Sequence, residues 1–131
     1  MAVCSLTLGG VMDEFPRLRF CFFEAGASWM TYAMYGANRS FEIEPQCART
    51  TTLPSELIRE RCLTAVEPAE PLQHLVAAIG SRNFFFGTDF PHPEYQRYQN
   101  TAAAILEREG LSQDDKDNIL GGNIARFLNI D

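Results

Sequence analysis

The sequence predicts an α/β protein built on a parallel sheet. Three apolar runs with the character of buried strands, at 18–24, 62–67 and 83–89, alternate with segments whose apolar residues have helical spacing. Buried strands separated by helices are typical of a parallel sheet with right-handed crossovers. The chain has 131 residues, 46% of them hydrophobic, and can bury a core. It is too short for a closed eightfold β/α barrel, which needs roughly 200 residues or more.

Each element has a local signal that supports it. The expected order starts with an amphipathic stretch at 2–14 that breaks at Pro16, the first strand at 18–24, and a helix capped by Ser28 that continues to about Arg39. After an irregular segment at 40–54 we expect a helix from Pro54 to about Arg61, the second strand at 62–67, and a helix at 72–79 stopped by Gly80. The third strand at 83–89 is followed by a loop at 90–94, a helix at 101–109, and a final helical region that starts at Ser112, is interrupted or ended near 121–122 and resumes through Phe127. We treat 1–131 as one domain.

The charge balance excludes some classes of partner. Seventeen acidic residues stand against eleven basic ones, for a net charge of -6. A nucleic-acid partner needs a basic face and an anionic membrane surface attracts one, so we expect neither partner. The sequence has no apolar run near the roughly 20 residues that span a bilayer, and its start lacks the basic region of a signal peptide.

The four cysteines, Cys4, Cys21, Cys47 and Cys62, form no C-x-x-C pair. Cys21 and Cys62 lie inside apolar runs, where a buried free thiol is the usual state. Neither has a histidine nearby in the sequence, which disfavours a thiol nucleophile. We therefore expect a reducing, cytoplasmic compartment.

A carboxylate ends each of the three apolar runs: Glu24, Glu67 and Asp89. Ligand sites of parallel α/β sheets lie at the carboxyl ends of the strands, so these acids are expected to converge on one rim. There they could bind a cation or perform acid–base chemistry. The alternative is that they cap the next helix, which for Glu67 is at least as well supported as catalysis. Asp89 has the strongest functional case, because it directly follows a buried strand.

Two other residues are candidates for the rim. His92 lies three residues after Asp89 between two prolines, which hold the loop rigid, although a lone loop histidine more often faces solvent. Trp29 opens the helix after the first strand, and it either packs that helix on the sheet or forms a wall of a substrate pocket.

Four segments carry a family likeness: GGVMDEFPRLR (9–19), FEAGASW (23–29), FGTDFPHPE (86–94) and NILGGNIARFL (118–128). In this order they resemble the amidohydrolase-related family, in the branch of aminocarboxymuconate-semialdehyde decarboxylase-like metal-dependent hydrolases. The likeness covers nearly the whole chain. It implies a partial TIM-type (β/α)8 barrel, made of strands six to eight with their helices.

The resemblance also implies site roles. Asp89 matches the last-strand aspartate that binds metal or takes the proton of the attacking water, and Glu24 stands where many relatives carry a metal-binding histidine. His92 matches a loop residue whose role varies in the family. The implied cofactor is a divalent metal, zinc first and manganese second. The family's H-x-H pair on strand one is absent, so the chain itself could hold none.

Three functions follow as hypotheses. The first is the C-terminal part of a metal-dependent hydrolase or decarboxylase of small carboxylated or cyclic substrates, truncated and inactive alone. The second is a non-catalytic half-barrel that assembles with itself or is completed by another chain. The third is a flavodoxin-like binding domain, for which 25–28 is the single candidate phosphate loop. The sequence leaves open whether this chain is itself an enzyme.

Overall fold

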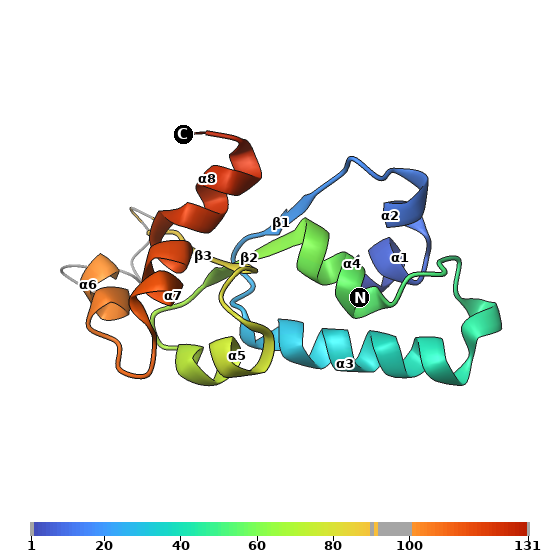
Figure 1. Cartoon of the computed structure of the whole chain (residues 1–131), viewed down its shortest axis with the longest axis horizontal. Coiled ribbons are helices and arrows are strands. Elements are labelled where there is room, and N and C mark those ends of the chain that lie inside the picture. The colour runs from blue at the N-terminus through green and yellow to red at the C-terminus, as the bar shows by residue number, and fades with distance from the viewer. Residues whose placement is uncertain (1, 90, 92–100, 131) are drawn as a thin grey trace. The chain divides into compact units, whose positions relative to one another are not determined.

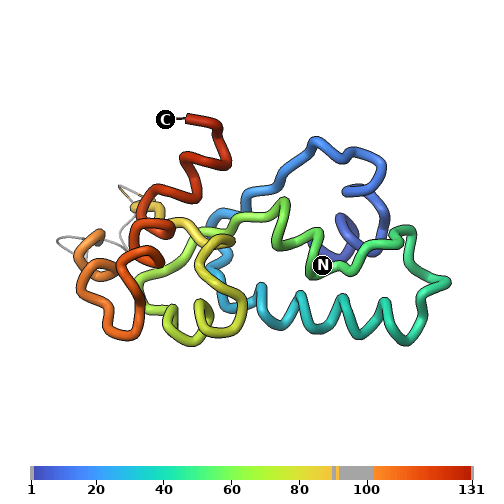
Figure 2. The backbone as a smooth tube through the Cα atoms, viewed as in Figure 1, coloured from blue at the N-terminus to red at the C-terminus, as the bar shows by residue number. Residues whose placement is uncertain are grey.

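The computed structural model describes residues 2–89, 91 and 101–130 (Figure 1). The described chain falls into two compact units. The first consists of the residues up to Cys21 together with Trp29–Cys62, and the second consists of Phe22–Ser28 together with the residues from Leu63 onward. Figure 2 traces the course of the backbone, in which α4 (Pro54–Arg61) is followed directly by the segment Cys62–Val66. The expectation of a single partial domain stays a prediction.

The first unit is helical. It contains α1 (Ala2–Thr7), α2 (Val11–Glu14), most of α3 (Ser28–Ile43), the short 3-10 helix η1 (Pro45–Cys47) and α4. The amphipathic stretch predicted at 2–14 is two helices, because Gly10 adopts a left-handed backbone with φ 80°. A Cβ at that position would lie 2.7 Å from the carbonyl oxygen of Arg49, so the close approach of these two segments requires glycine.

Helix α3 is longer than predicted, and the start of the segment predicted as irregular is therefore wrong. The helix continues to Ile43 because its buried residues Met30, Met34 and Ala37 keep one apolar face turned to the core. Its Asn38 side chain also accepts a hydrogen bond from the backbone N–H of Ser55 at 2.9 Å, near the start of α4. This bond satisfies one of the free donors at the helix N-terminus.

The sheet has three strands in the order β1 (Phe20–Phe22), β2 (Cys62–Val66) and β3 (Phe84–Phe86). β2 and β3 are parallel, with Thr64 opposite Phe84. The α/β class and this parallel pairing confirm the prediction.

The apolar run at 18–24 is not a strand buried on both faces. Only three of its residues form β1, and all three are half-buried. Leu18 and Phe23 are 47% and 64% exposed. The density of apolar residues predicted the strand but not how many layers cover it.

The second unit adds α5 (Leu72–Ile79), α6 (Thr101–Leu106), α7 (Gln113–Asp117), the π-helix η3 (Asn118–Gly122) and α8 (Asn123–Leu128). The bounds of α4 and α5 are those predicted from Pro54, Arg61 and the apolar spacing at 72–79. Ser112 caps α7 in a capping box with Asp115, as its position predicted.

The final helical region is not interrupted at 121–122. Gly122 keeps right-handed helical angles, φ -57° and ψ -39°, and α7, η3 and α8 follow one another without a break. A π-turn admits one extra residue per turn, which carries the two glycines through the helix instead of ending it.

A buried polar anchor fixes β3 in this unit. The side-chain amide of Asn123 donates to the carbonyl oxygens of Ser81 and Phe84 at 2.7 and 2.6 Å. Asn123 is 3% exposed, and both Phe84 and Ile119 are fully buried beside this anchor. The anchor holds the start of β3 and thereby sets the direction in which the strand reaches its carboxyl end.

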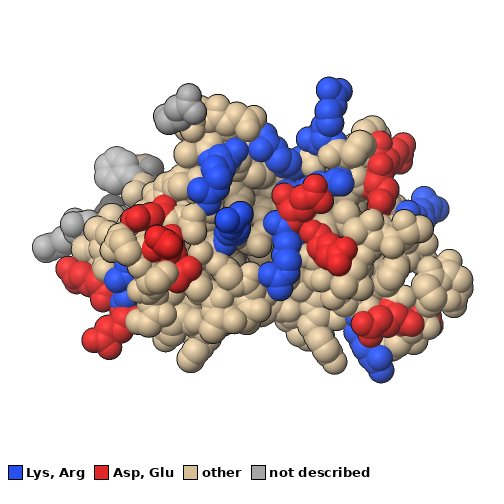
Figure 3. Space-filling model, in the orientation of Figure 1, with Lys and Arg blue, Asp and Glu red and all other residues tan. Residues whose placement is uncertain are grey.

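All four cysteines are free thiols, and Cys62 is buried. Burial raises the pKa of Cys62 to about 12, so this thiol stays protonated at neutral pH. Among the helices of the described residues, none is long and apolar enough to cross a membrane. Acidic and basic side chains both reach solvent on the face shown in Figure 3.

Candidate active site

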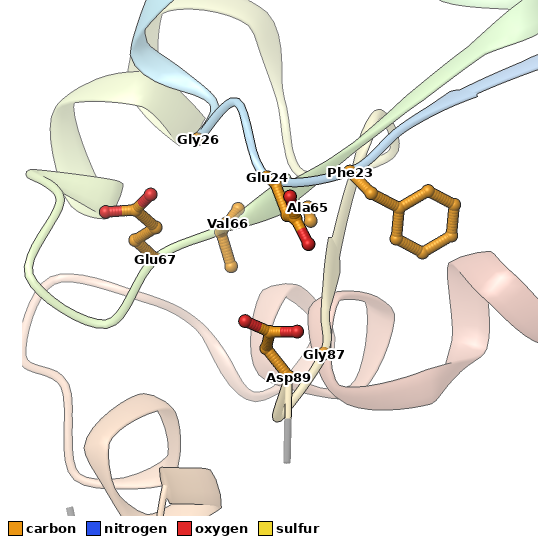
Figure 4. Close-up of a pocket in the computed structure, with 8 residues that line it drawn as sticks. All are labelled: Phe23, Glu24, Gly26, Ala65, Val66, Glu67, Gly87 and Asp89. Carbon is orange, nitrogen blue, oxygen red and sulfur yellow. The ribbon is translucent and has the colours of Figure 1, made fainter. Parts of the chain in front are cut away.

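A cavity of about 280 Å³ opens at the carboxyl ends of the three strands, within the second unit (Figure 4). Its lining residues come from the ends of β1, β2 and β3: Phe23, Glu24, Gly26, Ala65, Val66, Glu67, Gly87 and Asp89. The structure thus brings together the three strand-end carboxylates Glu24, Glu67 and Asp89. Their catalytic and metal-binding roles stay predictions.

Glu24 and Asp89 share an unusual backbone conformation. Their φ angles are 54° and 47°, in the left-handed region that side chains with a Cβ rarely adopt. Such a residue costs roughly 1–3 kcal/mol, and strained residues of this kind cluster at active sites. The other described non-glycine residue with positive φ is Asn129, which ends α8 and needs no functional explanation.

The side chains of Glu24 and Asp89 point toward one another into the cavity (Figure 4). The carboxylate of Glu67 is directed away from them, although the residue lines the same cavity. Glu67 is also not one of the described non-glycine residues whose φ angle is positive. The three strand-end acids therefore divide into a facing pair and a third residue at the edge.

Glu70 is the residue that the sequence did not reveal. Its carboxylate accepts hydrogen bonds from the backbone N–H groups of Ala27 and Ser28, both at 2.8 Å, and from the Ser28 hydroxyl at 2.7 Å. It also accepts from the backbone N–H of Glu67 at 2.9 Å. An acid three residues after a strand end, directly before Pro71, signals at most a helix cap, and nothing in the sequence indicates its partners more than 40 positions away.

This arrangement argues against the flavodoxin-like hypothesis. The candidate phosphate loop at 25–28 would need its backbone N–H groups free for an anion. Those of Ala27 and Ser28 are occupied by the carboxylate of Glu70. The carboxylate of Glu70 therefore occupies the place that a bound phosphate would take in this loop.

Two further residues were predicted at the rim, His92 and Trp29. His92 is outside the described residues. Trp29 is half-buried at the start of α3 and is not among the described residues that line the cavity. A role for either in a substrate pocket stays a prediction.

The described residues do not complete a metal site. They contain no group of three or more histidine, cysteine, aspartate or glutamate side chains that could hold a metal ion. A catalytic zinc needs about three protein ligands and an open position. Glu24 and Asp89 are oxygen donors of the kind that hard divalent cations prefer, so together they fit part of a ligand set and not a whole one.

The charge of the cavity limits what it can accept. Glu24, Glu67 and Asp89 are acidic, and no described lining residue is basic. Like charges repel, so a cation between them would favour the approach of an anionic substrate to these carboxylates.

Comparison with known proteins places the chain among the amidohydrolases. A sequence profile of the amidohydrolase family matches residues 1–130. The chain is 30% identical, over 134 aligned positions, to a 2-amino-3-carboxymuconate-6-semialdehyde decarboxylase from Dictyostelium discoideum, and the match covers 100% of this chain and 36% of that protein. It thus spans about a third of the length of the curated relatives it matches.

Solved structures show the same fold. A crystal structure of an amidohydrolase from Mycobacterium avium subsp. paratuberculosis superposes with a TM-score of 0.82 at 23% identity, over 96% of this chain and 32% of that one. A dihydroxybenzoic acid decarboxylase from a Polaromonas species, solved with bound manganese and an inhibitor, gives a TM-score of 0.72 at 18% identity, over 97% and 38%. The architecture is therefore a partial β/α barrel, as predicted, and the chain belongs to the amidohydrolase family.

Proposed function

We propose that this chain supplies the acidic rim of a metal-dependent hydrolase or decarboxylase that acts on small carboxylated or cyclic molecules. One observation carries the proposal: Glu24 and Asp89, both in strained left-handed conformations, face each other across a cavity at the carboxyl ends of the strands. The relatives support the reaction class, since the Dictyostelium protein is a decarboxylase and the Polaromonas structure contains manganese.

In this proposal Asp89 accepts the proton of an attacking water in the cavity. A carboxylate held at a strand end within reach of a cavity water is suited to general acid–base work. Glu24 faces the same space and would orient that water or contribute an oxygen ligand. A divalent metal, zinc or manganese, would offset this negative charge when a carboxylated substrate binds.

The proposal includes that the chain is inactive alone. Its described residues offer only part of a metal ligand set, so the remaining ligands must come from residues beyond those described. A cation held by two exposed carboxylates alone binds weakly. Elemental analysis after dialysis against zinc or manganese should find far less than one metal per chain, and a tightly held, stoichiometric metal would contradict this part.

Paramagnetic NMR tests the rim directly. Millimolar Mn²⁺ should broaden the amide signals of Glu24 and Asp89 before other signals of the 14.7 kDa chain. The double variant Glu24→Gln with Asp89→Asn should abolish this selective broadening. Glu107→Gln, which removes an exposed acid elsewhere in the second unit, should leave it unchanged. Broadening that is spread evenly over all surface acids would contradict the proposal.

A second candidate function is a non-catalytic half-barrel that assembles with itself or with another chain. It is favoured by the sheet order, because β1 and β3 each have one strand neighbour in the described part of the chain. Exposed strand edges favour pairing with other strands. Sedimentation over a hundredfold concentration range should then show association, and a monomer at all concentrations would exclude the self-assembling form. We also propose a cytoplasmic location from the free thiols.

A further inference from the structure

The carboxylate of Glu70 joins two loops that each carry a strand-end acid. The loop after β1 contains Glu24 and continues to Ala27, and the loop after β2 starts at Glu67. Glu70 belongs to the second loop. It accepts hydrogen bonds from that loop's first N–H, at Glu67, and from the N–H groups of Ala27 and Ser28, where the first loop meets α3. One side chain therefore links the two loops through hydrogen bonds to both.

Further hydrogen bonds hold the loop that bears Glu70. The backbone N–H of Glu70 donates to the carbonyl of Glu67 at 3.0 Å, which closes a four-residue turn with Pro68 at the position where proline favours turns. The guanidinium of Arg108 donates to the carbonyl oxygen of Glu70 at 3.1 Å and also to that of Pro68. The acid therefore projects from a turn that is fixed on both sides.

The partner loop has the shape that this contact demands. Gly26 has φ 59°, and a Cβ added there would lie 2.9 Å from a carboxylate oxygen of Glu70. The hydroxyl of Thr64 donates to the carbonyl of Gly26 at 2.8 Å in a buried position. The end of the loop is thus held from β2 and from Glu70, and Glu24 lies only two residues before Gly26.

We propose that Glu70 is a positioning residue that keeps Glu24 in its left-handed conformation and directs the Glu24 carboxylate into the cavity. The functional importance of Glu70 rests on the proposed function, but its effect on the conformation of Glu24 can be tested separately. Asp89 follows β3, on a different loop from the two that Glu70 joins, so it serves as an internal control. Loss of Glu70 should affect Glu24 and spare Asp89.

The test is Glu70→Gln, compared by NMR with Glu109→Gln, which changes an exposed acid in the same unit. A glutamine amide presents donors to the donors that now surround the carboxylate. Hydrogen exchange at the Ala27 and Ser28 amides should accelerate about tenfold or more, since hydrogen bonds to charged groups are the stronger ones. The Cα and Hα chemical shifts that report positive φ should be lost at Glu24 and kept at Asp89.

The metal readout separates the two proposals. In Glu70→Gln, broadening by Mn²⁺ should fall at Glu24 and persist at Asp89. If Mn²⁺ broadens neither residue in the unchanged chain, the proposed function fails, while the chemical shifts still decide the role of Glu70. If Glu24 keeps its left-handed shifts in Glu70→Gln, the positioning role is wrong.

A milder variant covers the case in which Glu70→Gln does not fold. Ser28→Ala removes the hydroxyl that donates to Glu70 and leaves the three backbone donors in place. It should change the Glu24 shifts in the same direction by a smaller amount. Unchanged shifts at Glu24 together with a chain that folds normally would contradict the proposal.

Discussion

The cavity rim and the buried anchor of β3 lie in the same unit but differ in burial and in backbone strain. At the anchor, Asn123 is buried and its amide is bonded to two carbonyl oxygens, next to the fully buried Phe84. At the rim, Glu24 and Asp89 are exposed acids held in strained backbone conformations. β3 connects the two regions, since it begins at the anchor and delivers Asp89 to the rim.

This difference separates stability from function. A satisfied buried amide stabilises the fold, because removing it leaves its partners without hydrogen bonds in a place closed to water. A strained exposed acid works against stability and is retained only if its position serves another purpose. If the two regions have these roles, substitutions in them should have opposite signs.

The largest effect is expected at the anchor. Asn123→Ala leaves the carbonyl oxygens of Ser81 and Phe84 without this donor, and we expect the free energy of unfolding to fall by about 1–3 kcal/mol. Urea unfolding followed by circular dichroism measures this change. The matched control is Asn129→Gly at the exposed end of α8, where glycine suits the left-handed backbone, and it should cost clearly less. Equal losses would mean that the anchor is not a centre of stability.

A smaller effect of opposite sign is expected at the rim. Glycine relieves a left-handed backbone, worth about 1–2 kcal/mol, and loses about 0.5–1 kcal/mol in chain entropy. Glu24→Gly and Asp89→Gly should therefore leave the free energy of unfolding unchanged or raise it by about 0.5–1 kcal/mol. Glu67→Gly, at a strand end without positive φ, should lower it by about 0.5–1 kcal/mol.

Thermal and urea unfolding of the three glycine variants decide this comparison. The same experiment would overturn the division of the rim if Glu24→Gly and Glu67→Gly lost equal stability. Mn²⁺ broadening should meanwhile disappear at the substituted position in the first two variants. A gain in stability together with a loss of cation binding would be the signature of a functional residue held under strain.

The sequence predicted the parts of this picture that depend on local pattern. The order of strands and helices, the bounds of α4 and α5, and the cap at Ser112 follow from apolar spacing and from proline, glycine and serine signals. The convergence of Glu24, Glu67 and Asp89 on one cavity follows from the geometry of parallel sheets.

The rest depends on contacts that no local pattern contains. The positive φ of Glu24 has no signature in residue type, and that of Asp89 has only the modest tendency of aspartate toward this region. Glu70 is defined by backbone donors at Ala27 and Ser28, and a backbone donor is the same for every residue except proline. The exposure of β1 likewise depends on which elements cover it, which the apolar run does not encode.

The smallest effect is expected at the base of the final helical region, where pH tests the cap. The hydroxyl of Ser112, with a further hydrogen bond from Ser81, lowers the pKa of the Asp115 carboxyl below its usual value. A lowered pKa stabilises the fold above the unfolded-state pKa, and the contribution is lost as pH falls through the folded-state pKa. The acid side of the stability–pH curve should therefore be shallower in Asp115→Asn, with little change in slope above pH 5. Because Asp115 is only half-buried, solvent screens its carboxylate, and the change should be smaller than at the rim. An acid limb as steep as in the unchanged chain would show that the cap carries no charge-dependent stability.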